Sequence, residues 1–189
     1  SCKISGGNGG AIYFSNSNNG QCVLHEVCGY DCCTTDSNYV LFHYIYVKDD
    51  ISSKNYVNYS SISRCVNENA YQFWQLYYGT IFCPSVNISN NKCKGNSVLC
   101  RPLSNSNSVT CSFSYSTISD NNATYCAWII LWTVAAKYEI KSCNILRNTQ
   151  GSLNSCGTIY TFGNTMIVDS CFLENNANCI FYQGSSQYT

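Results

Sequence analysis

Charged side chains are scarce in this chain of 189 residues. Ten Lys and Arg balance ten Asp and Glu, and together they make up 11% of the sequence. Nucleic acids attract proteins through clustered basic side chains, so this composition excludes nucleic acid as a partner. It also excludes a disordered chain, because 45% of the residues are apolar and 16 are tyrosines. The polar residues are mainly Asn, Ser and Thr, which suits contact with carbohydrate or protein.

Two hydrophobic patterns are also absent. No stretch repeats its apolar residues with the 3.6-residue period of an amphipathic helix. The most apolar run, residues 127–136 (AWIILWTVAA), is about ten residues long, which is too short to cross a bilayer core of about 30 Å. We therefore expect neither helices nor a membrane span in this sequence.

The sequence contains a repeat instead. The segment 137–148 (KYEIKSCNILRN) defines a grid centred on Ile145, with Tyr138 at −7, Ile140 at −5, Cys143 at −2 and Asn148 at +3. Further copies of the grid, some of them partial, are centred on Ile4, Val27, Ile62, Ile88, Ile118 and Leu173. Successive centres, Ile145 included, are separated by 23, 35, 26, 30, 27 and 28 residues.

Each repeat unit consists of short alternating runs of β-branched and aromatic residues, separated by Asn, Ser and Gly. This is the pattern of short strands and turns, and a unit of this length matches one coil of a parallel β-helix. Stacked coils would bury the inward positions in continuous ladders, and Asn at +3 could form amide hydrogen bonds along the stack. The sequence predicts one all-β solenoid domain over residues 1–189, with six to seven coils of 23–35 residues.

The unit lengths and the two ends give further expectations. The unit between Val27 and Ile62 is the longest, which predicts a loop insertion near residues 48–55. Neither end shows a cap, although an open coil edge invites pairing with another chain. We expect the sequence to be a piece of a longer protein. The alternative is that open coil ends assemble end to end.

Cysteines are unusually frequent. There are 15, an odd number that cannot all pair within one molecule, and this content indicates a secreted or surface protein. The grid places Cys2, Cys143 and Cys171 at −2, and Cys22 and Cys83 at −5. Such cysteines are either buried thiols in a ladder or disulfide partners, and the sequence leaves both open. Cys93 and Cys100 lie off the grid beside an expected loop and form the candidate disulfide.

The chain resembles the large right-handed β-helix surface-protein family of trichomonad parasites in six segments: GGAIYFS, QCVLHEVCGYDCC, YSSISRCVNEN, YSTISDNNAT, KYEIKSCNILRNT and LENNANCIFYQGSS. The resemblance covers essentially the whole chain. It implies a right-handed parallel β-helix of pectate-lyase-like shape, displayed at the cell surface. It also implies adhesion to host cells or to other surface proteins. Longer members are expected to carry a C-terminal transmembrane segment, which this sequence does not contain. No catalytic residues carry over.

An enzyme is the less favoured alternative. Glycoside hydrolases need converging carboxylates, but the only adjacent acidic pair is Asp49 and Asp50, which strand alternation would point to opposite faces. Neither a Gly-His-Gly nor an Arg-x-Lys element is present to complete a pectinase-like site. His25 lies near a group of cysteines that lacks the second pair of a zinc knuckle. We expect no polysaccharide lyase or glycoside hydrolase activity, no metal and no cofactor.

Two sets of residues are candidates for surface function. Sequons predict glycosylation at Asn58, Asn87 and Asn122. An exposed aromatic patch would serve as a contact surface, and the candidates are Trp74, Tyr77, Tyr78, Trp128 and Trp132. The sequence thus predicts a non-enzymatic, secreted or cell-surface glycoprotein module for adhesion or display. Its partner would be a host-cell or matrix protein or glycan. A filament-forming module is the alternative.

Overall fold

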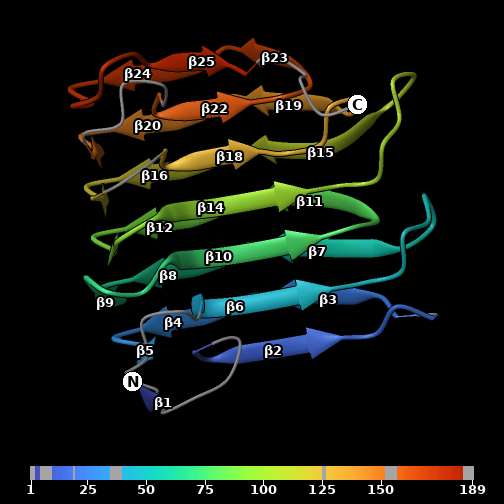
Figure 1. Ribbon diagram of the computed structural model, residues 1–189, viewed down its shortest axis with the longest axis horizontal. Helices are drawn as coiled ribbons and strands as arrows, with labels where there is room; N and C mark the ends of the chain where they lie inside the picture. The colour runs from blue at the N-terminus through green and yellow to red at the C-terminus, as the bar shows by residue number, and fades with distance from the viewer. Residues whose placement is uncertain are drawn as a thin grey trace.

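The computed structural model describes residues 3–4, 10–18, 20–34, 40–124, 127–151 and 157–184. Within these residues the chain forms strands and turns and no helix. The strands pair in parallel and wind into a β-solenoid of about five turns, slightly fewer than expected. Figure 1 shows the coils stacked in chain order from β2 to β25. The predicted all-β solenoid is confirmed.

Each coil contributes one strand to each of several stacked sheets. Sheet 1 contains β2 (Ile12–Ser15), β6 (Val40–Tyr46), β10 (Gln72–Tyr77), β14 (Asn96–Arg101), β18 (Ile129–Leu131), β22 (Ile159–Thr161) and β25 (Phe181–Gln183). Sheet 2 contains β3 (Cys22–His25), β7 (Lys54–Asn58), β11 (Thr80–Pro84), β15 (Val109–Ser114), β19 (Lys137–Lys141) and β23 (Asn164–Val168).

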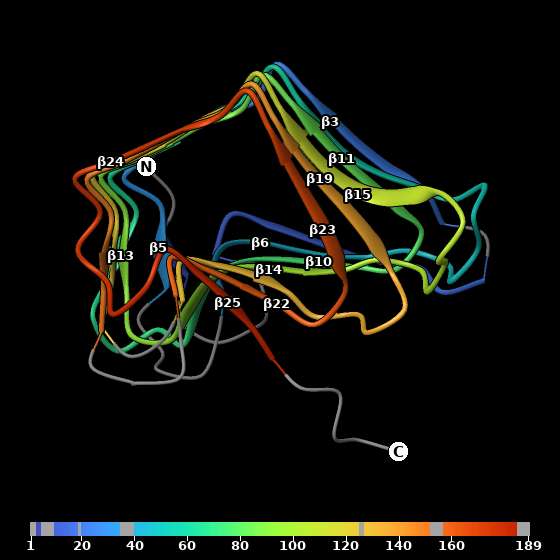
Figure 2. The ribbon, with the colours of Figure 1, turned by 90° about the horizontal axis from the view of Figure 1, so that it is seen from above.

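The two remaining large sheets consist of shorter strands. Sheet 3 contains β4 (Cys28–Tyr30), β8 (Ser61–Ser63), β12 (Asn87–Ser89), β16 (Thr117–Ser119), β20 (Asn144–Leu146) and β24 (Cys171–Leu173). Sheet 4 contains β9 (Val66–Asn67), β13 (Lys92–Cys93), β17 (Asn122–Ala123) and β21 (Thr149–Gln150). A separate pair joins β1 (Lys3–Ile4) and β5 (Cys33–Thr34). Figure 2 looks along the stack and shows sharp corners where sheet 3 meets sheets 2 and 4.

The centre of sheet 3 is a ladder of isoleucines. Ile62, Ile88, Ile118 and Ile145 are in register in successive coils and buried, as the repeat predicts. Each strand exposes its two flanking residues more than this central one, which follows from side-chain alternation over three residues. The grid therefore identifies the central coils correctly.

The grid is wrong by one or more residues at both ends. Phe172, not Leu173, pairs with Ile145, and Leu173 is 52% exposed. Cys171 is consequently an exposed residue of β24 and lies at −1. At the other end the predicted centres are Val27 and Ile4. Gly29, not Val27, pairs with Ile62, and Ile4 pairs with Thr34 in the separate two-stranded sheet. Cys2 lies outside the described residues.

The sharp corners require left-handed backbone conformations at residues other than glycine. The corner between sheets 2 and 3 has φ of 49–55° in six successive coils, at Glu26, Tyr59, Ser85, Tyr115, Ser142 and Asp169. The corner between sheets 3 and 4 does the same at Asp31, Arg64, Asn90, Asp120, Arg147 and Glu174. Such a backbone costs about 1–2 kcal/mol per residue. The first of these corners lies between the grid positions −5 and −2, at Ser142 in the coil centred on Ile145.

An asparagine ladder stabilises the second corner. Asn91, Asn121 and Asn148 are buried at +3, and the Nδ2 of each donates to the Oδ1 of the asparagine in the next coil, at 2.9–3.0 Å. Each Nδ2 also donates to a backbone carbonyl of the preceding coil. The predicted amide ladder is confirmed, although it ends in Asn175 rather than Asn176. In the first coils, Cys32 and Cys65 take this position.

Serines stabilise the first corner in alternate coils. The Oγ atoms of Ser60, Ser116 and Ser170 accept hydrogen bonds from the backbone N–H of the preceding coil, at 3.0–3.1 Å. The same hydroxyls donate to backbone carbonyls two residues earlier in their own coil. At both corners, side chains that recur along the stack therefore form hydrogen bonds with backbone groups that would otherwise be buried without a partner.

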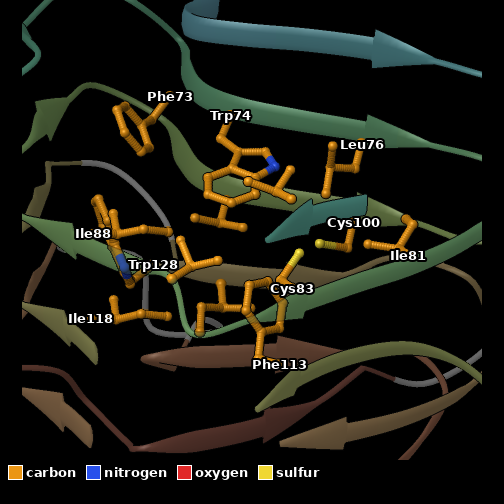
Figure 3. Packing of buried hydrophobic residues seen from close by; sticks show 14 of the residues in the cluster. Phe73, Trp74, Leu76, Ile81, Cys83, Ile88, Cys100, Phe113, Ile118 and Trp128 are labelled. Atoms are coloured by element: carbon orange, nitrogen blue, oxygen red, sulfur yellow. The ribbon is translucent and has the colours of Figure 1, made fainter. Parts of the chain in front are cut away.

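The interior of sheet 1 contains the largest buried side chains. Phe73 and Trp74 are both fully buried, although neighbouring residues on a strand should face opposite ways. The register with β6 shifts between Gln72 and Trp74, and this irregularity points two consecutive rings inward. Figure 3 shows both rings beside Trp128 and Phe113 in the core. The predicted exposure of Trp74 is thus wrong.

The connection between β6 and β7 lies within the unit that the sequence identifies as the longest. Residues 47–53 join the two strands, whereas β10 and β11 are joined by Tyr78 and Gly79 alone. The predicted insertion at 48–55 therefore ends earlier, because residues 54 and 55 already belong to β7. Asp50 lies within this connection and accepts hydrogen bonds from the backbone and hydroxyl of Ser52.

Candidate functional site

Tyrosines dominate the outer face of sheet 1 in the first coils. Tyr13 and Tyr44 are in register in adjacent strands, and their rings stack with centroids 5.4 Å apart and an interplanar angle of 15°. Tyr13 is 57% exposed. Tyr44 and Tyr46 share a face because they are two residues apart on one strand. Burial, followed by the neighbouring tyrosines, raises the pKa of Tyr44.

The row continues at the end of strand β10. Tyr77 is in register with Tyr46 on one side and with Arg101 on the other. The ring of Tyr46 meets Tyr78 edge-on with centroids 5.0 Å apart. The Arg101 guanidinium carbon lies 5.6 Å from the centre of the Tyr78 ring, within the range of a cation–π contact. One cationic side chain thus lies beside the aromatic rings at this point in the stack.

A pocket of about 350 Å³ opens between the coils at this point, lined by Tyr71, Gln72, Tyr77, Leu99, Arg101 and Trp132. Tyr71 and Trp132 are 43% and 42% exposed, so both rings are accessible to a ligand. Leu99 is buried in a small second cluster with Ala127 and Ile130, against which Tyr77 packs. The pocket therefore combines aromatic walls, an apolar residue, one amide and one cation.

Further aromatic rings extend the surface toward the last described coils. Trp132 contacts Phe162 with ring centroids 4.9 Å apart, and Phe162 contacts Tyr160 at 4.7 Å. Tyr160 in turn meets Tyr182 edge-on at 5.3 Å. We call this whole set the aromatic row; its members are Tyr13, Tyr44, Tyr46, Tyr77, Tyr78, Trp132, Phe162, Tyr160 and Tyr182.

A second, wider depression borders the row. It encloses about 700 Å³ and is lined by Val134, Phe162, Gly163, Asn164, Thr165, Phe181, Gln183 and Gly184. Its lining contains amides, a hydroxyl and two aromatic rings but no charged side chain. Phe181 and Gln183 are in register with the buried residues Ile159 and Thr161, so this second hollow lies at the end of the stack, whereas the pocket at Arg101 lies on the outer face of sheet 1.

Three of the five predicted contact aromatics belong to the row. Tyr77 and Tyr78 are half-buried and Trp132 is exposed. The prediction is wrong for Trp74 and Trp128, which are fully buried in the core. The shifted strand β10 turns Trp74 inward, and Trp128 stacks on Phe73 with centroids 6.1 Å apart.

Arg101 was missed as a site residue. Its sequence context, Arg101-Pro102, indicates only the end of a strand. Its position beside Tyr77 depends on pairing between residues that are 24 positions apart, and the position of Tyr46 beside Tyr77 depends on pairing across 31 positions. Alternation of tyrosines within 40–46 was the one local signal that could have identified the first part of the row.

The predicted glycosylation sites all lie on outward positions. Asn87 is exposed on β12, between the buried residues Val86 and Ile88. Asn58 on β7 and Asn122 on β17 are half-buried and alternate with buried neighbours. The side-chain oxygen of Asn58, however, is buried without a hydrogen-bond partner. Glycosylation at the three sites stays a prediction.

The candidate disulfide between Cys93 and Cys100 is wrong. Both are buried free thiols; the Sγ of Cys93 lies 3.3 Å from the Oγ of Ser97. Cys93 belongs to sheet 4, whereas Cys100 belongs to sheet 1 and interacts with Cys111 of sheet 2. Buried free thiols also occur at Cys22, Cys32, Cys65, Cys83, Cys111 and Cys143. The described coils therefore use cysteine as a small core residue.

The acidic residues of the described coils pair with cations at the corners instead of gathering in a groove. Asp120 accepts two hydrogen bonds from Arg147, at 2.6 and 2.8 Å, and these bonds hold the pKa of Asp120 below its usual value. Asp31 lies 3.3 Å from Arg64. Within the described ranges, no three His, Cys, Asp or Glu side chains are arranged to hold a metal ion.

Comparisons with known proteins add no family assignment. The chain matches no known protein family, no curated protein and no solved structure. No helix in the part of the chain that the structure describes could span a membrane. The resemblance to trichomonad surface proteins therefore stays a prediction, and function has to be inferred from the surface itself.

Proposed function

We propose that this chain is a non-enzymatic adhesion module of a secreted or cell-surface protein and that the aromatic row is its contact surface. The observation that carries the proposal is the row itself. Neighbouring rings lie 4.7–6.2 Å apart along one face of the stack, with Arg101 between its two halves. Tyrosine and tryptophan are enriched at contact surfaces because each combines an apolar ring with a polar O–H or N–H group.

The chemistry of the row favours a glycan among the possible host-cell or matrix ligands. Tyrosine and tryptophan faces are flat and apolar, whereas their edges and the neighbouring amides form hydrogen bonds. Gln72, Asn164 and Gln183 supply amides in the two hollows. The stacked coils hold these groups in place, which lowers the entropy lost on binding. An extended ligand lying along the stack would contact successive coils.

A binding experiment tests the proposal. The purified chain is applied to a glycan array and to cultured epithelial cells, alongside a variant with Tyr77→Ala and Trp132→Ala. We expect the wild-type chain to bind and the double variant to lose about tenfold or more in affinity, because aromatic anchors dominate interfaces. Tyr115→Asn removes a 66% exposed tyrosine from a left-handed corner and serves as the control. Equal binding by all three proteins would refute the aromatic row as the contact surface.

A second function, self-association, has its own supporting observation. Strands β23, β24 and β25 border three sheets and expose apolar side chains, including Met166, Ile167, Leu173 and Phe181. Ile167 is in register with buried Ile140, so another coil stacked here would bury it. Sedimentation velocity over a concentration series tests association between copies. Ile167→Lys should abolish any concentration-dependent assembly, while leaving the binding of the aromatic row unchanged.

A further inference from the structure

The pocket at Arg101 contains an accessible cation without a salt-bridge partner. Arg101 is exposed, and no salt bridge among the described residues includes it. The nearest acidic influence is Asp49: burial raises the pKa of that carboxyl, and Arg101 counteracts this effect. The other pocket residues are uncharged. The guanidinium therefore provides the one formal charge that a ligand in this pocket would meet.

The guanidinium is held in a defined orientation. Arg101 is in register with Tyr77 on the adjacent strand, so the two side chains point to the same face of sheet 1 from neighbouring coils. Its contact with the Tyr78 ring restrains the guanidinium further. A planar guanidinium presents paired N–H donors that match the two oxygens of a carboxylate or sulfate.

The walls of the pocket favour a ring-shaped ligand over a bare anion. Tyr71 and Trp132 line the pocket with exposed rings, and Gln72 supplies an amide. A volume of about 350 Å³ lies within the range of small-molecule sites and holds one or two sugar rings. An isolated phosphate or sulfate ion would leave these apolar walls in contact with water.

We propose that this pocket binds an acidic sugar residue of a glycan, with the carboxylate or sulfate on Arg101 and the sugar ring against Tyr77 and Trp132. The proposal rests on the proposed adhesion function and specifies its ligand class. The chain has no net charge, so attraction comes from this one site. Binding should therefore weaken only modestly with salt, in contrast to ligands recognised by a basic patch.

Calorimetry with chemically matched oligosaccharides tests the proposal. The probes are a glucuronate-containing hyaluronan hexasaccharide, the same hexasaccharide after carboxyl reduction, and a chondroitin sulfate hexasaccharide. Chondroitin sulfate carries a sulfate in addition to the glucuronate carboxylate, so tighter binding of this probe than of the hyaluronan probe would indicate that the sulfate contributes. We expect the wild-type chain to bind at least one acidic probe about tenfold or more tightly than the carboxyl-reduced probe, because charge-assisted hydrogen bonds are lost on reduction.

Variants assign the preference to Arg101. Arg101→Gln should remove the preference for acidic probes, and Arg101→Lys should retain part of it, because lysine keeps the charge without the paired donors. The matched control is Arg64→Gln. Arg64 also lies over a tyrosine ring, 4.7 Å from Tyr30, but is already paired with Asp31. This control should bind like the wild type.

The outcomes separate the two proposals. Equal affinity for acidic and reduced probes, lost on Trp132→Ala, would overturn the acidic-sugar site and leave adhesion through the aromatic row intact. An acidic preference that survives Arg101→Gln would also overturn the site. If no hexasaccharide binds, the acidic-sugar site is refuted, and the cell-binding comparison of the Tyr77 and Trp132 variant decides separately whether the row binds another ligand.

Discussion

The ring of Phe42 fills the space beside Gly29 that a side chain at that position would occupy. A Cβ atom on Gly29 would overlap the edge of the Phe42 ring. Gly29 is in register with Ile62 and stands at the end of the isoleucine ladder of sheet 3. The first coil thus fills its core from sheet 1 rather than from sheet 3.

This contact predicts that Gly29→Ala destabilises the protein. The added methyl group cannot be accommodated without moving a buried ring, which costs about 1–3 kcal/mol. Urea unfolding measures the change. Phe42→Leu removes the obstructing ring, and the double variant should be less destabilised than the sum of the single variants. Additive losses would contradict the proposed contact.

The asparagine ladder predicts that the protein needs the hydrogen-bond donor of the Asn121 side chain for its stability. Its Nδ2 donates to the Ile88 carbonyl and to the Oδ1 of Asn148, both 2.9 Å away. Asn121→Asp replaces this donor with an oxygen that faces two acceptors in a buried corner. We expect a loss of about 3 kcal/mol or more in the free energy of unfolding. Asn144→Asp, at an exposed position of β20, is the control and should change stability little.

The burial of His43 predicts that the free energy of unfolding falls in mild acid. Burial lowers its pKa to about 3, and the ring lies against Trp74 with centroids 4.3 Å apart. The unfolded chain binds a proton near pH 6.5 that the folded chain cannot bind, so stability is retained above about pH 6.5 and is lost as pH falls toward 3. The loss should reach about 2 kcal/mol near pH 5.

The acid effect can be assigned by substitution. His43→Leu has no titrating group, so its stability should change less between about pH 7 and pH 5 than that of the wild type. Denaturant unfolding at both pH values measures the difference. An identical pH dependence in the two proteins would show that other groups cause the acid sensitivity.

The free cysteines predict a two-class labelling pattern. Cys28 and Cys171 are exposed, whereas burial raises the pKa of Cys65 and of Cys93 to about 12. Because the thiolate is the reactive form, a short pulse of iodoacetamide should modify the exposed pair and spare the buried pair. Peptide mass spectrometry reads the result, with guanidinium-unfolded protein as the control in which all four react. Labelling of Cys93 at the rate of Cys28 would contradict the burial of Cys93 in the core.

The repeat made the fold and the central ladder predictable. The strand alternation of each unit, the isoleucine at its centre and the asparagine three residues later are local features, and stacking identical units leaves few ways to bury them. The apolar residue at the centre of a unit cannot be identified locally where two consecutive residues are equally apolar. Phe172 and Leu173 cannot be distinguished within one coil, because register is decided by the coil below.

The composition of the site was less predictable. Tyr77 and Trp132 were found from aromatic content, but Trp74 was placed on the surface because alternation gave no warning of the shifted strand. Arg101 was missed because its partner Tyr77 is distant in sequence. The same holds for the cysteines: Cys93 and Cys100 are close along the chain but belong to different sheets.

The repeat pattern is sufficient to predict a parallel β-solenoid with asparagine corners, because these properties arise from patterns within one unit. Which rings face outward, which thiols are buried together and where a cation meets the aromatic row depend on how the coils stack. Each of these contacts joins residues from different coils or different sheets, and no pattern within one unit specifies how those residues align.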